Sequence, residues 1–232
     1  FSPRFARGEC GQGKGKDMKK IVYSKIKYII LSSMIIVFLL QGCTSFRIPV
    51  KQDSLIFQER EGKLPLNAGL FLSDETRTHV ITERYQGADW NFQIGEALEP
   101  SAIKSLQKVF QTVSVVNKEN IDSNIDRIIS LRFGPESNFK HGWTSWAQHT
   151  AVVELVYSVY DNKWNLLWEG TSLGTASDTS GGKQIAAALL TVFTAQAVHN
   201  KIIGKTMHDS LTAALEQFNE QILTSGRDII KR

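Results

Sequence analysis

The hydrophobic pattern of the chain changes twice, from an unbroken apolar run to strand-like alternation and then to helical periodicity. The opening run, Tyr28–Leu40, has thirteen uncharged residues and follows a block with four lysines. This length is typical of a signal-peptide core and short for a membrane span, which takes about 20 apolar residues. Residues 18–42, starting at Met18, are therefore predicted to be an export signal.

Alternation of apolar and polar positions predicts strands in the middle of the chain. Every second residue from Leu66 to Leu72 is apolar, which is the period of a half-buried strand. The strongest signal is a pair of long β-rich runs separated by the polar residues 161–163, which predicts a hairpin. The predicted strands are Leu66–Ser73, His79–Tyr85, Thr112–Val116, Arg127–Phe133, Ala151–Tyr160 and Trp164–Ala176.

Helical spacing of apolar residues first appears between Leu98 and Phe110. Pro100 followed by Ser101 is typical of a helix start, because proline fits the first turn, where its missing N–H is not needed. The pattern therefore predicts a helix from Pro100 to Phe110.

The carboxy-terminal region is predicted to be helical. Ile185–Val198 has no charge, and after Gly204 an apolar stripe runs from Met207 to Ile222, as in an amphipathic helix packed on a sheet. Fourteen uncharged residues make a helix of about 21 Å, too short to cross a bilayer comfortably. The segment is expected to be a buried core helix, a surface for a partner or a second copy, or a membrane insertion.

The order of the elements predicts the fold class. Strand, helix, further strands and terminal helices are typical of an α+β domain with helices on one face of a largely antiparallel sheet. Residues 43–63 are polar and charged and are predicted to be a flexible tether, 64–224 the single folded domain, and 225–232 a tail. Residues 1–17 precede Met18 and are interpreted as an upstream remnant outside the native protein.

Charge changes the picture once it is located along the chain. The formal net charge is +4, which alone would suggest a nucleic-acid binder. Residues 1–42 hold eight of the lysines and arginines and only two acids, so 19 basic and 21 acidic residues remain after them. A mature chain with a net charge of −2 does not favour nucleic acid as a partner.

Cysteine usage points to lipid attachment. Cys10 and Cys43 are the only cysteines, and Cys10 precedes Met18, so no internal disulfide can form in the mature chain. The sequence Leu40-Gln41-Gly42-Cys43 resembles the bacterial lipobox, Leu-x-(Gly/Ala)-Cys. The resemblance implies diacylglyceryl transfer to the Cys43 sulfur, cleavage between Gly42 and Cys43, and acylation of the new amino terminus with a chain such as palmitate.

The implied anchor would be stable, because two or three acyl chains hold a protein where one alone binds marginally. By analogy with lipoproteins of enteric type, Thr44 after the cysteine points to the outer membrane. The alternatives are an ordinary cleaved signal and an uncleaved anchor helix with a coincidental cysteine.

The common catalytic motifs are incomplete or missing in the sequence, so the protein is expected not to be an enzyme. Gly182-Lys183 lacks the further glycine and the Ser/Thr of a phosphate loop, and there is no Gly-x-Ser-x-Gly elbow. The only mature thiol is the predicted lipid site. No cofactor or metal site is expected, since no two histidines are three or four residues apart and only the fold could bring them together. The histidines are His79, His141, His149, His199 and His208.

One polar segment is a candidate binding surface. Residues 134–150 are predicted to form a loop that carries Trp143 and Trp146. Tryptophans in a polar loop are typical of a binding surface or an interfacial contact, although two tryptophans three residues apart can equally cap the edge of a core.

Taken with the lipobox, the order of elements resembles small outer-membrane lipoproteins with a periplasmic α+β domain. These are the YajG-like group and, more loosely, the TolB amino-terminal and CsgG-type domains. The resemblance implies a non-catalytic accessory component of a secretion, transport or surface-structure assembly, on the periplasmic side of the cell outer membrane. Its partners would be the membrane and envelope proteins, including copies of itself. The alternative is a binder of a small ligand or of an envelope polymer such as peptidoglycan, through Trp143 and Trp146.

Overall fold

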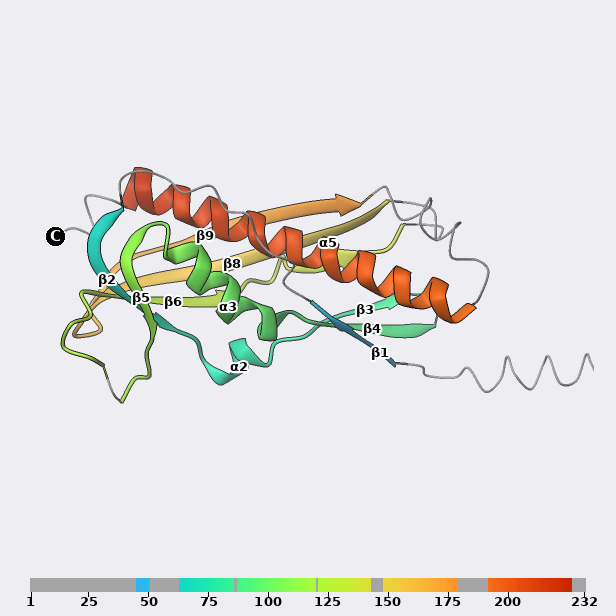
Figure 1. The fold of residues 1–232 in the computed structure, drawn as a ribbon, viewed down its shortest axis with the longest axis horizontal. Coiled ribbons are helices and arrows are strands. Elements are labelled where there is room, and N and C mark those ends of the chain that lie inside the picture. The colour runs from blue at the N-terminus through green and yellow to red at the C-terminus, as the bar shows by residue number, and fades with distance from the viewer. Residues whose placement is uncertain are drawn as a thin grey trace, which may run out of the picture. The chain divides into compact units, whose positions relative to one another are not determined.

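The computed structural model describes residues 45–50, 63–85, 87–119, 121–142, 148–178 and 192–226. For residues 192–198 and 225–226 only the backbone is described. All of these residues belong to one compact unit, Ser45–Arg232. Figure 1 shows its elements as ribbons.

Six strands form the larger sheet. Its order is β5-β2-β6-β8-β7, and β9 pairs with the other side of β8. β2 lies parallel to both β5 and β6, whereas β8 is antiparallel to β6, β7 and β9. The strands are β2 (Leu64–Phe71), β5 (Phe110–Val115), β6 (Arg127–Phe133), β7 (Asn138–Lys140), β8 (His149–Asp161) and β9 (Leu166–Asp178).

A second sheet has three strands in the order β1-β4-β3. β1 (Ser45–Pro49) runs parallel to β4 (Ala88–Gln93), and β3 (Ile81–Tyr85) is antiparallel to β4. The turn between β3 and β4 contains Gly87 at φ 78°, a backbone conformation that glycine adopts without a Cβ clash.

Three α-helices accompany the sheets in the described part of the chain. They are α2 (Asp74–Arg77), α3 (Ile94–Leu106) and the thirty-residue α5 (Val192–Gln221), and a π-helical turn (Ile222–Gly226) follows α5. No helix among these described segments is long and apolar enough to span a membrane.

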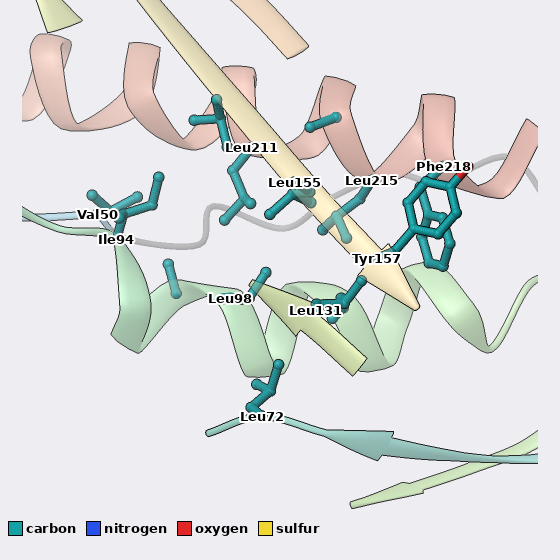
Figure 2. Packing of buried hydrophobic residues seen from close by; sticks show 14 of the residues in the cluster. Val50, Leu72, Ile94, Leu98, Leu131, Leu155, Tyr157, Leu211, Leu215 and Phe218 are labelled. Carbon is teal, nitrogen blue, oxygen red and sulfur yellow. The ribbon is translucent and has the colours of Figure 1, made fainter. Parts of the chain in front are cut away.

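The core lies between the larger sheet and the two long helices. Figure 2 shows Leu131 and Leu155 of the sheet with Leu98 of α3 and Leu211 and Leu215 of α5, and all five are buried. Burying one such side chain contributes about 1.5–3 kcal/mol relative to exposure, so this layer holds the helices on the sheet.

The sheet predictions are largely confirmed. The chain is an α+β fold, and β2, β3, β5 and β6 occupy the positions that alternation predicted. The hairpin is confirmed, since β8 and β9 pair antiparallel along almost their whole length. The sheets are more mixed than predicted, because three of the seven described strand pairs are parallel.

Three strands and one helix were not predicted from the sequence. These are β1, α2, β4 and β7, which are each six residues or shorter. β1 lies inside the segment that was predicted to be a tether, and β7 lies inside the predicted loop 134–150. Strand pairing decides both cases, since β1 is held by β4 and β7 by β8.

The helix limits were also partly wrong. α3 begins at Ile94 and ends at Leu106, so Pro100 lies inside the helix and not at its start. The lost hydrogen bond is offset by packing, because Leu98 and Ala102 beside it are fully buried. α5 continues through Gly204 as one helix, and the close approach of that glycine to the Pro49 carbonyl explains why a residue without Cβ stands there.

Candidate functional site

The residues that sequence analysis chose as sites fall largely outside the described part of the chain. Gly42 and Cys43 precede Ser45, and Trp143 and Trp146 fall in the gap at residues 143–147. Ile185–Val198 is described only from Val192, as helical backbone. The described residues therefore do not test these predictions.

The structure instead brings together three histidines, which we call the histidine cluster: His141, His149 and His199. Their ring centroids are 5.4 Å apart between His141 and His149, 5.2 Å between His149 and His199, and 6.2 Å between His141 and His199. His141 directly follows β7, His149 begins β8, and His199 lies on α5. Three separate elements thus meet in the cluster.

Strand register explains half of this arrangement. β7 and β8 pair antiparallel, with Lys140 opposite Thr150, so His141 and His149 occupy the next opposed positions. Residues 142–148 connect them. The spacing of His141 and His149 is visible in the sequence, but it predicts that the two rings meet only if β7 is recognised as a strand. The position of His199 in the cluster depends on how α5 packs on the sheet, and no local sequence pattern predicts it.

Aromatic rings surround the cluster. Tyr85 of β3 stacks on His141 with ring centroids 4.3 Å apart, and Trp90 of β4 lies 5.0 Å from His141 and 5.5 Å from His199. Phe139 of β7 contacts the rings of both His141 and His149. The imidazoles therefore lie among weakly polar surfaces that offer them little compensation for lost water.

The ring nitrogens lack hydrogen-bond partners within the described residues. This holds for both nitrogens of His141, for both nitrogens of His149, which is only 1% exposed, and for Nδ1 of His199. A buried polar group without a partner costs about 1–3 kcal/mol, so such a concentration in one place is unusual for a core.

Burial also sets the charge state of the cluster. Desolvation, together with the neighbouring histidines, lowers the pKa of His141 and of His199 from 6.5 to about 4. Burial lowers the pKa of His149 as well, while the negative charge of Asp178, its partner in the register of β8 and β9, acts in the opposite direction. At neutral pH the three rings are uncharged.

The cluster differs from a metal centre in two respects. Within the described ranges no group of three or more His, Cys, Asp or Glu side chains is arranged to hold a metal ion. In addition, a ligating histidine usually donates its second ring N–H to a carboxylate or carbonyl, and the rings of His141 and His149 make no such bond to any residue that the structure describes.

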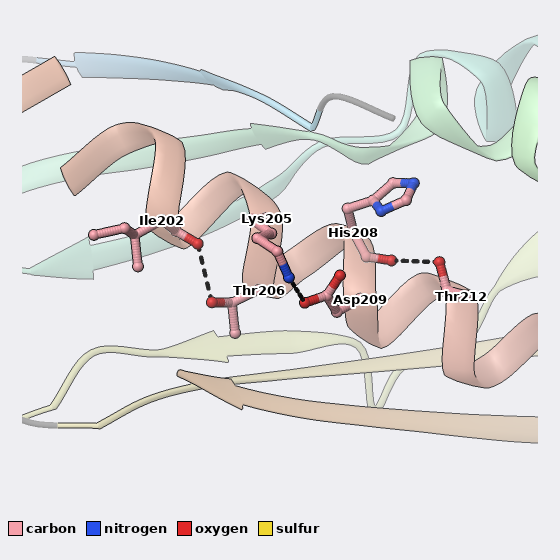
Figure 3. Close-up of polar contacts among 6 residues, drawn as sticks. All are labelled: Ile202, Lys205, Thr206, His208, Asp209 and Thr212. Carbon is pink, nitrogen blue, oxygen red and sulfur yellow. Dashed lines mark hydrogen bonds and ion pairs between the residues drawn. The ribbon is translucent and has the colours of Figure 1, made fainter. Parts of the chain in front are cut away.

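The polar contacts farther along α5 are internal to the helix. Figure 3 shows Thr206 Oγ1 donating to the Ile202 carbonyl at 3.0 Å and Thr212 Oγ1 donating to the His208 carbonyl at 3.0 Å. Lys205 and Asp209 form an ion pair one turn apart. These bonds satisfy side chains on their own helix and do not form a second site.

No protein-family model matches this chain, and no curated protein matches it. Among solved structures, a DUF330-family protein from Xanthomonas campestris is similar at 12% identity and a TM-score of 0.47, over 82% of this chain and 99% of that one. A minor lipoprotein from Acinetobacter baumannii is similar at 13% identity and a TM-score of 0.38, over 69% and 94%. The PelC dodecamer from Paraburkholderia phytofirmans is similar at 14% identity and a TM-score of 0.32, over 64% and 92%. At these values none of the likenesses bears on what the chain binds or does.

Proposed function

We propose that this chain is a lipoprotein of the bacterial cell envelope, anchored through Cys43, that serves as a non-catalytic accessory component of an outer-membrane or periplasmic assembly. The proposal rests on one observation, that the end of the lipobox-like sequence and the start of the folded domain nearly agree. The lipobox-like sequence Leu40–Cys43 ends two residues before Ser45, and Ser45 is where the compact unit and strand β1 begin. The predicted cleavage would thus release a chain whose fold starts almost at its acylated residue.

Such a boundary implies that the domain is held close to the bilayer. An extended chain spans at most about 3.3–3.6 Å per residue, so the two residue steps from Cys43 to Ser45 cover at most about 7 Å. The sheet β1-β4-β3 would then be the nearest part of the fold to the lipid surface, with Asp89 opposite Ser45 in the register.

The chemistry of the described residues supports an accessory role over catalysis. The one thiol of the predicted mature chain would be consumed by the lipid. Among the described residues, no hydrogen bond joins the rings of His141 and His149 to a carboxylate that could orient them as bases. Contacts with envelope proteins or with further copies would use exposed apolar positions such as Leu166 and Leu173 on β9.

Metabolic labelling of the full chain with a palmitate analogue tests the anchor. Cys43→Ala should abolish incorporation of the label and release the protein from the membrane fraction. Cys10→Ala is the matched control, because this cysteine lies before the predicted signal, and it should change neither result. A Cys43→Ala variant that still sediments with membranes, or an unmodified Cys43 sulfur by mass spectrometry, contradicts the proposal.

Cross-linking in intact cells tests the accessory role. We expect a Cys43-anchored chain to be cross-linked to envelope proteins or to itself, and the Leu173→Ser variant to lose part of those products. A chain that stays monomeric and yields no cross-linked partner contradicts an accessory role while leaving the anchor intact.

A further inference from the structure

We propose that the histidine cluster is an acid-sensitive contact that, when neutral, holds the part of α5 around His199 against the end of the β7–β8 hairpin and, when protonated, releases it. The inference concerns the folded domain alone. It therefore stands or falls separately from the lipid anchor.

The geometry makes the contact dependent on neutral rings. His199 is the α5 member of the cluster, and its ring lies 5.2 Å from His149 and 5.5 Å from Trp90. Uncharged imidazoles can pack in this way, whereas imidazolium ions at the same separations repel one another in a region with little water.

Little negative charge is available to offset such protonation. The carboxylate of Asp178 on β9 favours the charged form of His149. The neighbour stacked on His141 is the phenol of Tyr85, which is not an anion at neutral or acid pH. One carboxylate can balance one added proton, so a second proton in the cluster remains uncompensated. The other titratable or charged groups on the surrounding elements are Arg47 on β1, Glu83 and Arg84 on β3, Asp89 on β4, Lys140 on β7, and Lys201, the buried His208 and the Lys205–Asp209 pair on α5.

The lowered pKa values support an acid range for this change. An imidazole freed into water regains a pKa near 6.5, whereas those of His141 and His199 are about 4 in the closed arrangement. Acid therefore favours the open arrangement, and its population rises as the pH falls from about 6.5 toward about 4.

We expect the rest of α5 to stay packed on the core when the contact at His199 opens. Leu211, Leu215 and Phe218 are fully buried in the apolar core, and Asn219 bonds α3, and none of these contacts titrates in this range. Between the cluster and Leu211, Ile203 and Met207 are also buried in the core, while Gly204 approaches the Pro49 carbonyl without any side chain of its own. Opening is thus expected to start at the cluster and to stop before Leu211.

Hydrogen exchange of the full chain in detergent micelles, corrected for the intrinsic pH dependence, tests the proposal. Between pH 7 and pH 4 we expect exchange in residues 199–206 to rise at least about tenfold, while residues 211–221 keep their protection. The triple variant His141→Phe/His149→Phe/His199→Phe should lose this response. If the triple variant fails to fold, the single variant His199→Phe should show a reduced response.

The control is His79→Phe, which removes a histidine outside the cluster, one that stacks on Phe133. It should respond to acid as the unaltered chain does. Three outcomes overturn the proposal: unchanged protection of residues 199–206 at pH 4, simultaneous loss of protection in both segments, or a triple variant that opens as before. Stoichiometric binding of Zn²⁺ at pH 7 that depends on all three histidines would also overturn it and identify a metal site instead.

Discussion

Asn219 is a buried polar residue of α5 that bonds Ser105 of α3, 114 positions earlier in the chain. Its Nδ2 donates to the Ser105 carbonyl at 3.0 Å and to Ser105 Oγ at 2.8 Å, linking α5 with α3. Replacing it by alanine removes both bonds and leaves the buried Ser105 hydroxyl without this donor, although the Ser105 carbonyl still accepts from the Lys108 N–H, and we expect Asn219→Ala to lower the free energy of unfolding by about 1–3 kcal/mol. Urea denaturation measures this loss. Asn117→Ala, at an exposed position, should stay within about 0.5 kcal/mol of the unaltered chain.

His79 shows how single neighbours set a proton equilibrium. Burial lowers its pKa from 6.5, and Glu75 in α2 counteracts that effect. Because the folded state disfavours the charged form, the unfolded chain binds more protons here, and stability is lost as the pH falls below about 6.5.

Removal of the carboxylate should therefore deepen this effect. We expect Glu75→Gln to lower the pKa of His79 further, as measured by NMR titration of the imidazole. Asp74→Asn removes a charge from the same helical turn and serves as the control, with a smaller expected change. A pKa that rises in Glu75→Gln would show that the carboxylate does not stabilise the charged ring.

At the scale of elements, α5 protects an edge strand. In the described sheet β9 pairs only with β8, and its outer backbone groups would be open to another strand. Gln217 accepts from the Leu173 N–H, and Gln221 Nε2 donates to the Thr171 carbonyl at 3.1 Å. The helix thus satisfies part of this edge with side chains.

Loss of this cover should favour self-association. We expect Gln217→Ala/Gln221→Ala to form larger species at concentrations where the unaltered domain does not, as measured by sedimentation velocity. Glu216→Ala, on the exposed face of the same helix, is the control and should behave like the unaltered chain. Identical sedimentation of the double variant and the control would show that the edge needs no such cover.

How far the sequence predicts the elements depends on their length. β8 and β9 are each thirteen residues long, and their alternation is strong enough to identify the hairpin without tertiary information. β1 and β7 are short and are specified by their partner strands, which a local pattern does not contain. Pro100 is misleading for a similar reason, since the packing of α3 outweighs the local preference of proline for a first turn.

At the scale of the whole molecule, the candidate site could not be predicted because it is assembled by topology. Two of its members depend on strand register and the third on the docking of α5, at a sequence separation of fifty residues from His149. The lipid site is the opposite case, since Leu40–Cys43 is a contiguous motif that requires no fold. Contiguous chemistry is thus visible in this sequence, whereas the cluster becomes visible only in three dimensions.

The short distance between Cys43 and the fold leads to a prediction about the anchored molecule. A fluorophore on Asp89→Cys, opposite Ser45, should be quenched by nitroxide-labelled lipid head groups in reconstituted vesicles, since acylation leaves no other thiol in the mature chain. A fluorophore on Lys163→Cys should be quenched much less. Lys163 lies in the turn beyond Asp161, at the far end of β8, a strand whose thirteen residues extend about 40 Å.

The matched control alters only the spacing. Ten Gly/Ser residues inserted between Thr44 and Ser45 leave the lipobox intact but give the domain a flexible chain of about 16–19 Å root-mean-square length, so the quenching at position 89 should fall toward that at position 163. Equal quenching at the two positions before the insertion would mean that the domain lies flat or rotates freely on the membrane. In that case the position of β1 next to the acylated residue would not determine which end of the fold faces the lipid.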